Sequence, residues 1–384
     1  MACILPWRSG RWCDRSHRDT STGPAGGGNP IRGAGAGPRP KSSKSQACNW
    51  SDNRSMPGFR PSPALSGATD LHSAPSALSA PPAPSSRPAP TQVHSAFYRF
   101  VPLADPMASA AALRRLGEAC GVLGAILLAR EGLNGAVAGT PQAVQAFEAG
   151  LCAGGAGLGW HAQALQGLVF KHSACHQPPF ARLKVGVKPE IVALGPLHDV
   201  DAAGLPPPDE QDDSHLSPQD WRTLMQRDDV VLLDNRNHFE FRLGRFAGAL
   251  DPQVASFRDF QAALSDAAPR WRADGEAVAM YCTGGIRCDK TAPWLRSLGL
   301  TVWQLDGGIL NYCQSLPDAD RDWQGECFVF DRRIALDSRL RETGRRPQEV
   351  YDPRRPDEAW RLERALRLDA AVAGPSAPQD DGHA

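Results

Sequence analysis

The stretch Ala277-Val278-Ala279-Met280-Tyr281-Cys282-Thr283-Gly284-Gly285-Ile286-Arg287-Cys288 decides the fold of the second half of this chain. It opens with five apolar residues, and a short apolar run bounded by glycines is typical of a strand buried in a parallel sheet. A helical pattern follows the glycines. In open α/β sheets, sites form at the carboxyl ends of the strands. The stretch therefore predicts a strand, a loop and a helix of an α/β domain, with a site at the loop.

The composition of this loop predicts a reactive thiol. Gly284 and Gly285 let the chain curl so that successive backbone N–H groups point inward, which makes an anion-binding nest. The positive N-terminal end of the next helix and the Arg287 guanidinium add to that field. A cysteine in such a field loses its proton below its ordinary pKa and becomes nucleophilic. We predict that Cys282 is catalytic, although a buried cysteine before a glycine-rich turn is the alternative. The predicted active-site loop consists of Thr283, Gly284, Gly285, Ile286 and Arg287.

The second cysteine of the stretch, Cys288, falls on the first turn of the predicted helix, where packing is the more common role. If its sulfur faces the loop, it can resolve an oxidised or persulfidated Cys282. Four residues separate Cys282 from Arg287, one fewer than in cysteine-based phosphatases. This shorter loop favours a small sulfane group over a tetrahedral phosphate.

Two further apolar runs, at 230–234 and 301–305, predict more buried strands of the same sheet. Helical patterns separate them, so we expect an α/β domain with a parallel sheet over residues 218–335. The chain after this domain, 336–384, is polar and rich in arginine. We expect it to be a tail with one short helix near 358–371.

The segment 94–195 predicts a domain of another type. Helical patterns interrupt its strand-like segments in the order β-α-β-β-α-β, which is the split βαβ of ferredoxin-like folds. The expected strands are 96–101, 125–129, 136–138 and 182–187, and the expected helices are 108–119 and 141–152. The predicted fold class is therefore α+β followed by α/β, with residues 196–217 as a polar linker.

Residues 1–93 are dominated by Gly, Pro, Ala, Ser and Arg. Such a segment buries too little apolar surface to offset its ordering entropy, so we expect a disordered low-complexity extension. The alternative is that translation starts further in.

Composition and charge restrict the compartment and the partners. The 42 basic and 42 acidic residues give a net charge of +0, so RNA binding would need a local basic patch. No apolar run approaches the roughly 20 residues of a membrane span, and charges interrupt the N-terminal apolar residues at once. The ten cysteines are then expected to be free thiols in a reducing cytosol. We predict a cytoplasmic protein with no membrane partner.

The segment 233–250 resembles the first motif of rhodanese-like domains. It contains Asp234, Arg236 and Glu240, followed by Gly-Arg-Phe-Ala-Gly-Ala-Leu at 244–250. Paired charges more often hold geometry than take part in chemistry, so we expect Arg236 and Glu240 to form an ion pair beside the cysteine loop. The predicted supporting or resolving residues are Cys288, Asp234, Arg236 and Glu240.

Five separated motifs resemble the bacterial tRNA uridine(34) hydroxylase family, over about residues 96 to 337. They are Glu-Gly-Leu-Asn-Gly at 131–135, Pro-Phe-Ala-Arg-Leu-Lys-Val at 179–185, residues 282–290, Leu-Asp-Gly-Gly-Ile-Leu at 305–310 and Trp-Gln-Gly-Glu-Cys-Phe-Val-Phe-Asp at 323–331. This resemblance implies hydroxylation of the wobble uridine of tRNA to 5-hydroxyuridine, with molecular oxygen as co-substrate. It also implies that Cys282 is catalytic, as a thiolate or a persulfide. In two departures, Asp289 stands where many relatives carry Glu, and the tail after Ala335 lacks the cysteine-bearing motif that many members have.

No cofactor site is identifiable in the sequence. The only candidate metal cluster is His172, Cys175 and His176, and the prolines at 178 and 179 argue against a helix that would present both imidazoles. We predict no metal. The candidate RNA-binding residues are Arg130, Asn134, Arg182 and Lys184, with Lys171, Lys188 and the arginines of 339–367 as further cations, and solvated surface charge as the alternative.

The resemblance implies an oxidoreductase that modifies tRNA, with no DNA partner. The sequence gives no oligomeric state. The first alternative is a rhodanese-type sulfurtransferase, which explains the cysteine loop but not the motifs of the first domain. The second is a non-enzymatic RNA-binding or redox-sensing module, against which the intact Cys282 and Arg287 argue.

Overall fold

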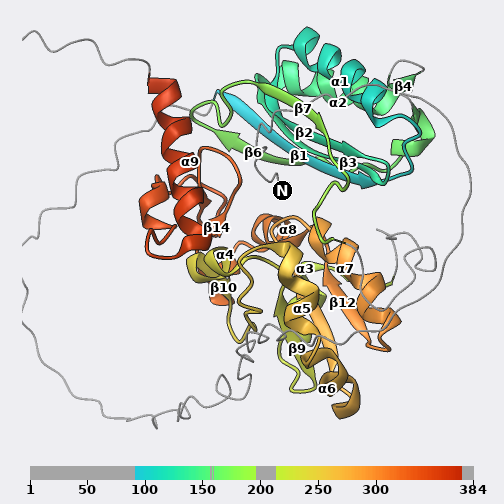
Figure 1. Cartoon of the computed structure of the whole chain (residues 1–384), viewed down its shortest axis with the longest axis vertical. Helices are drawn as coiled ribbons and strands as arrows, with labels where there is room; N and C mark the ends of the chain where they lie inside the picture. The colour runs from blue at the N-terminus through green and yellow to red at the C-terminus, as the bar shows by residue number, and fades with distance from the viewer. Residues whose placement is uncertain (1–90, 156–157, 159, 196–212, 374–384) are drawn as a thin grey trace, which may run out of the picture. The chain divides into compact units, whose positions relative to one another are not determined.

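The computed structural model describes residues 91–155, 158, 160–195 and 213–373. Residues 1–90 of the predicted disordered extension lie outside the described residues. Residues 196–212 of the predicted linker also lie outside them. In the described part, a five-stranded sheet with two helices precedes a parallel four-stranded sheet and a C-terminal helix (Figure 1). The predicted fold class, α+β followed by α/β, is confirmed.

The first sheet has the strand order β6-β1-β3-β2-β7, and α1 and α2 cover one of its faces (Figure 1). Its main elements are β1 (Gln92–Phe100), α1 (Pro106–Cys120), β2 (Leu123–Ala129), β3 (Gly132–Gly139), α2 (Pro141–Ala153), β6 (Lys171–Cys175) and β7 (Leu183–Val187), with the short β4 (Gly154–Gly155), β5 (Trp160–His161) and η2 (Ala162–Leu165) before β6.

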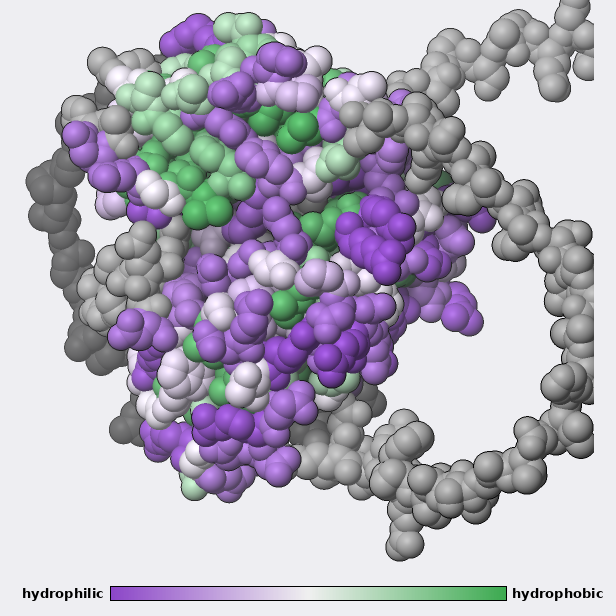
Figure 2. Space-filling model, turned by 180° about the vertical axis from the view of Figure 1, so that it is seen from behind, coloured by the Kyte–Doolittle hydropathy of each residue, from purple (hydrophilic) through white to green (hydrophobic). Residues whose placement is uncertain are grey.

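The ends of α1 follow from its sequence. The Asp105 carboxylate accepts hydrogen bonds from the Met107 and Ala108 N–H groups, both at 3.0 Å, and Pro106 occupies the first turn. Gly121 ends the helix with φ of 71°. Hydrophobic residues gather on part of the surface of this domain (Figure 2). Met107 of α1 is 68% exposed.

The predicted position of one strand in this sheet is wrong. Residues 183–187 do form a strand, but β7 pairs in parallel with β2 at an edge of the sheet. The fourth strand of the ferredoxin-like order is β6, which pairs antiparallel with β1. Its sequence, Lys-His-Ser-Ala-Cys, does not show the apolar alternation of a strand, because polar contacts replace apolar packing there. For example, Ser173 accepts a hydrogen bond from Arg333 at 2.8 Å.

The second sheet is parallel, with the order β8-β12-β11-β9, and helices surround it (Figure 1). Its strands are β8 (His215–Leu216), β9 (Val230–Asp234), β11 (Ala277–Tyr281) and β12 (Val302–Leu305). Its helices are α3 (Pro218–Leu224), α4 (His238–Leu243), η4 (Phe257–Asp259), α5 (Phe260–Leu264), α6 (Ala267–Asp274), α7 (Ile286–Ser297), α8 (Gly308–Ser315) and η5 (Ala319–Arg321). The three apolar runs predicted as strands form β9, β11 and β12, and β8 comes from the segment that we expected to be linker.

The chain after residue 335 is packed against the second domain, whereas we expected a polar tail. Val350 and Tyr351 belong to a buried cluster with Phe239 and Phe328, and the Arg361 guanidinium lies 5.0 Å from the Phe239 ring centre. The remaining elements are β10 (Gly244–Phe246), β13 (Trp323–Gly325), β14 (Cys327–Phe328), β15 (Ala335–Leu336), η6 (Pro347–Glu349) and α9 (Pro356–Ala373). The helix expected at 358–371 is α9.

Candidate active site

Cys282 directly follows β11, at the carboxyl end of a strand that β9 and β12 flank. The next residues form the loop, and α7 begins at Ile286. The Gly285 N–H donates a hydrogen bond to the Cys282 sulfur at 3.1 Å, as expected for a nest of inward-pointing amides. Strand, loop and helix thus have the predicted arrangement, while the catalytic role of Cys282 stays a prediction.

Two glycines are needed for this geometry. Gly285, at the N-terminus of α7, has φ of 102°, a conformation that L side chains rarely adopt. Gly308, at the start of α8, has φ of 68°, and a Cβ atom there would lie 2.5 Å from the carbonyl oxygen of Cys282. The Ile309 N–H donates to that same oxygen at 3.0 Å, so α8 holds the cysteine loop by close backbone approach.

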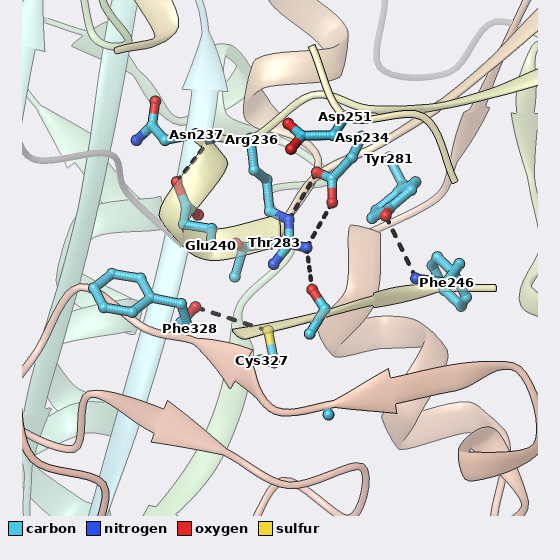
Figure 3. A network of polar contacts seen from close by, with 12 residues as sticks. Asp234, Arg236, Asn237, Glu240, Phe246, Asp251, Tyr281, Thr283, Cys327 and Phe328 are labelled. Atoms are coloured by element: carbon cyan, nitrogen blue, oxygen red, sulfur yellow. Dashed lines mark hydrogen bonds and ion pairs between the residues drawn. The ribbon is translucent and has the colours of Figure 1, made fainter. Parts of the chain in front are cut away.

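The charged residues around the loop are paired differently from the prediction. We expected Arg236 to pair with Glu240, but Arg236 makes a bidentate contact with Asp234 at 2.8 and 2.6 Å (Figure 3). Glu240 instead accepts two hydrogen bonds from Arg287, at 2.9 and 2.8 Å. These ion pairs have no exposed side-chain surface. The prediction was wrong because the position of α4 brings Glu240 to the cysteine loop and leaves Arg236 beside the end of its own strand.

The surroundings of Cys282 favour the thiolate. Burial raises the pKa of this thiol, but a hydrogen bond from the Cys288 S–H, the Arg287 charge and the Arg287 backbone N–H outweigh burial, so the pKa lies well below the ordinary value. Burial and the neighbouring Cys282 raise the pKa of Cys288, which therefore remains a thiol and a donor. The side-chain NH2 group of Asn235 lies 4.0 Å from the Cys288 sulfur, as a long hydrogen-bond donor.

Cys282 is 1% exposed, so a substrate reaches its sulfur only after part of the surrounding structure moves. The first domain contributes to this enclosure. Lys171 donates a hydrogen bond from Nζ to the Gly284 carbonyl oxygen at 2.9 Å, and the Tyr98 hydroxyl donates to Asp289 at 2.7 Å. The other oxygen of Asp289 lies 2.9 Å from Nε2 of His215.

Sequence reasoning missed the contacts that Tyr98 and His215 make with α7. Tyr98 and Asp289 are 191 positions apart in the sequence, so no local sequence pattern predicts their contact. Tyr98 lies in the segment 96–101, for which the sequence predicts a strand and no contact with the second domain.

The candidate RNA-binding residues have different positions. Asn134 is 1% exposed and donates its side-chain amide to the Ile191 carbonyl oxygen at 2.8 Å, so the amide satisfies a buried backbone group. Its contact with RNA stays a prediction. Arg130, Arg182 and Lys184 are exposed, and their role in RNA binding stays a prediction.

Of the residues considered for a metal, His172 and Cys175 lie on opposite faces of β6. His172 lies 2.7 Å from Glu148 of α2, whereas Cys175 is fully buried on the opposite face of the strand. Among the described residues, no group of three or more His, Cys, Asp or Glu side chains is placed to hold a metal ion. Within those same ranges, no helix has the length and apolar character needed to cross a membrane.

The fold and the site define a class of protein, in which an acylphosphatase-like domain precedes a rhodanese-like domain with a thiol in its loop. Residues 92–191 match the family described as UPF0176 acylphosphatase like domain. Residues 217–315 match the rhodanese-like domain family.

Relatives with both domains narrow this class to one family. The chain is 45% identical over 255 residues to a tRNA uridine(34) hydroxylase of Nitrobacter winogradskyi, which covers 65% of this chain and 93% of that relative. It is 44% identical over 246 residues to the protein of that name from Synechococcus elongatus, covering 64% of this chain and 85% of the relative. It is 41% identical over 256 residues to the tRNA uridine(34) hydroxylase of Caulobacter vibrioides, which covers 63% of this chain and 74% of that relative. The chain belongs to the tRNA uridine(34) hydroxylase family.

Proposed function

We propose that this protein hydroxylates the uridine at position 34 of tRNA, the wobble position. The observation that carries this proposal is the family match through both domains, which covers 93% of one relative named for this activity. Cys282 supports the proposal because Arg287, Cys288 and the loop amides stabilise its thiolate.

The proposed product is 5-hydroxyuridine, with molecular oxygen as the source of the added atom. Replacing the C5 hydrogen by a hydroxyl group inserts one oxygen atom and removes two electrons from the uridine. The second oxygen atom leaves as water, with two electrons from an external reductant. Cys282, as a thiolate or a persulfide, is the group of this chain that takes part in the oxygen chemistry, and the cytoplasm, where tRNA is used, is the proposed location.

Nucleoside mass spectrometry tests this function directly. The purified full chain is incubated with an unmodified tRNA transcript and a thiol reductant, in air, under isotopically labelled oxygen and without oxygen. We expect 5-hydroxyuridine at position 34 in air, the heavy isotope in that product, and no product without oxygen. Cys282→Ala should abolish the product, whereas Cys120→Ala, which changes a half-buried cysteine at the end of α1, should retain it. Product formed by Cys282→Ala at the wild-type rate would exclude the proposed role of this thiol.

A sulfurtransferase is the second candidate, because residues 217–315 match the rhodanese-like family and the loop suits a persulfide. In this reaction a sulfane sulfur passes from thiosulfate to Cys282 and then to cyanide, releasing sulfite and thiocyanate. Thiocyanate formation that depends on Cys282, with unmodified tRNA nucleosides in the first experiment, would favour this activity over hydroxylation.

A further inference from the structure

The edge strand β7 presents a cation on the face of its sheet that is opposite to α1 and α2. Leu183 and Val185 belong to the hydrophobic core that includes Leu113 of α1. Because successive side chains of a strand alternate between faces, Lys184 stands on the opposite face, where it is exposed. Gly186 faces the same way, and a Cβ atom there would meet nothing within 4 Å.

The neighbouring strand places two partly exposed apolar residues beside Lys184. In the parallel pairing of β2 and β7, Ala125 lies beside Lys184 and Leu127 lies beside Gly186. Ala125 and Leu127 are partly exposed. Lys184 therefore lies beside partly exposed apolar side chains, which suit the ribose and base surfaces of an RNA strand.

The C-terminal helix adds a cation to the same area. The Arg332 N–H donates to the Pro179 carbonyl oxygen at 3.2 Å, and the Arg332 side chain lies 3.9 Å from Asp369 of α9. Arg332 thus joins the segment leading into β7 to α9. Burial, and then the charges of Arg182 and Arg364, lower the pKa of Lys184. Arg182 and Arg364 are therefore both close enough to Lys184 for their charges to act on it.

These cations differ from the other arginines of the C-terminal segment. Most of those arginines have carboxylate partners, as where Arg345 lies 2.6 Å from Glu326 and Arg354 lies 3.0 Å from Asp352. In the described ranges, by contrast, no acidic side chain forms an ion pair with Arg182, Lys184 or Arg364. Clustered like charges destabilise the folded state unless an anion binds between them.

We propose that Arg182, Lys184 and Arg364 bind the phosphate backbone of the tRNA substrate, so that β7 and α9 together form an RNA-binding surface. This inference rests on the proposed function. It makes the C-terminal helix, which follows both domains, a part of substrate recognition. Because phosphate contacts add affinity without reading the sequence of bases, the surface positions the tRNA and leaves the choice of nucleotide to the site around Cys282.

The salt dependence of tRNA binding tests this surface without turnover. The affinity of the full chain for fluorescently labelled tRNA is measured at several salt concentrations for wild type, Lys184→Gln, Arg364→Gln and the double variant. Each lost phosphate contact lowers the slope of log affinity against log salt by about one. When the salt concentration rises fourfold, the wild type loses affinity for tRNA by a certain factor. This factor should be about four times smaller for a single variant and about 16 times smaller for the double variant.

Two controls accompany these variants. Arg354→Gln removes an exposed arginine of the same segment that already pairs with Asp352, and it should keep the wild-type slope. Lys184→Arg keeps the charge and should also keep it. Thermal unfolding at the wild-type midpoint would show that the glutamine variants are folded.

An unchanged slope in the folded double variant overturns the proposal. If hydroxylation still depends on Cys282 in that case, the proposed function stands and only the surface is wrong. If the slope falls as expected in the variants but the wild type forms no 5-hydroxyuridine, the surface stands as a tRNA-binding site and the proposed function fails.

Discussion

At the scale of single residues, the chemistry of this protein depends on two neighbouring cysteines with opposite tendencies. Both are buried, and burial by itself raises the pKa of a thiol. Cys282 nevertheless has a lowered pKa, because donors and a cation surround it, whereas the pKa of Cys288 is raised. One sulfur is thus prepared as a thiolate, and the other supplies a proton to the hydrogen bond between them.

Replacing Cys288 by alanine should raise the pKa of Cys282, since the S–H donor is lost while burial remains. Serine at this position keeps a donor and should raise it less. The measurement is the pH dependence of alkylation of the Cys282 peptide, followed by mass spectrometry. Cys120→Ala is the control and should leave the midpoint unchanged. A midpoint that stays in place in Cys288→Ala would show that Arg287 and the loop amides suffice.

Replacing Glu240 by glutamine should destabilise the protein by about 3–5 kcal/mol, because Arg287 is left charged and buried without its carboxylate. Burial raises the pKa of Glu240, but the charge and the hydrogen bonds of Arg287 lower it further, so the net shift is downward. The stabilising contribution is complete above the unfolded-state pKa and is lost as pH falls through the lower folded-state pKa.

Urea unfolding at several pH values measures both effects. The stability of the wild type should fall on acidification below the ordinary pKa of a glutamate, and this part of the fall should be missing in Glu240→Gln. A loss below about 1 kcal/mol at neutral pH, typical of exposed ion pairs, would contradict the expectation.

At the scale of elements, the cysteine loop depends on α7 and α8 together. The helix α7 begins inside the loop, and the first residues of α8 hydrogen-bond to it: the Ile309 N–H to the Cys282 carbonyl oxygen, and the Leu310 N–H to that of Thr283 at 3.1 Å. Loop geometry is therefore determined by a helix that begins 26 positions after Cys282.

Replacing Gly308 by alanine should displace the loop. The new Cβ would lie 2.5 Å from the Cys282 carbonyl oxygen and 2.8 Å from the Gly284 nitrogen, and backbone atoms cannot move aside as a flexible side chain can. We expect loss of hydroxylation and a lower melting temperature.

Gly299→Ala is the matched control. Gly299 also has positive φ, at 85°, but its Cβ would first meet the flexible side chain of Arg272, at 3.0 Å. It should cost about 1–2 kcal/mol of backbone strain and keep its activity. Equal effects of the two substitutions on melting and activity would show that close approach to the loop is unimportant.

At the scale of the whole molecule, the first domain takes part in enclosing Cys282. Tyr98 and Lys171 come from neighbouring strands of the first sheet, and both hydrogen-bond to the loop or to α7. Lys290 of α7 pairs with Glu131 and lies 3.3 Å from Glu190. The access of a reagent to the Cys282 thiol therefore depends on the contact between the first domain and the rhodanese-like domain.

Removing the Tyr98 hydroxyl should make Cys282 more accessible. A hydrogen bond to a charged group contributes about 1.5–3 kcal/mol, so Tyr98→Phe should speed alkylation of Cys282 roughly tenfold or more if opening occurs at this contact. Tyr351→Phe, which removes a hydroxyl far along the chain in the Phe239 cluster, is the control. An unchanged alkylation rate in Tyr98→Phe would place the opening elsewhere in the structure.

Much of the fold could be predicted because its signals are local. The strand, loop and helix at 277–288 follow from an apolar run, two glycines and a helical pattern within twelve adjacent residues. The caps of α1, Asp105 and Gly121, are equally local. The place of β6 was missed since its polar side chains make contacts with distant residues, which a pattern of hydrophobicity does not record.

The amino-acid sequence by itself determined the thiol, its glycine loop and the sheet that carries it, because backbone preference and burial of apolar runs act between neighbours. Only the tertiary structure decided that Arg287 pairs with Glu240 across 47 positions, that Asn134 is buried, and that Tyr98 meets Asp289. Long polar side chains have several partners within reach along the chain. Sheet register and helix packing fix the distances that select one of them.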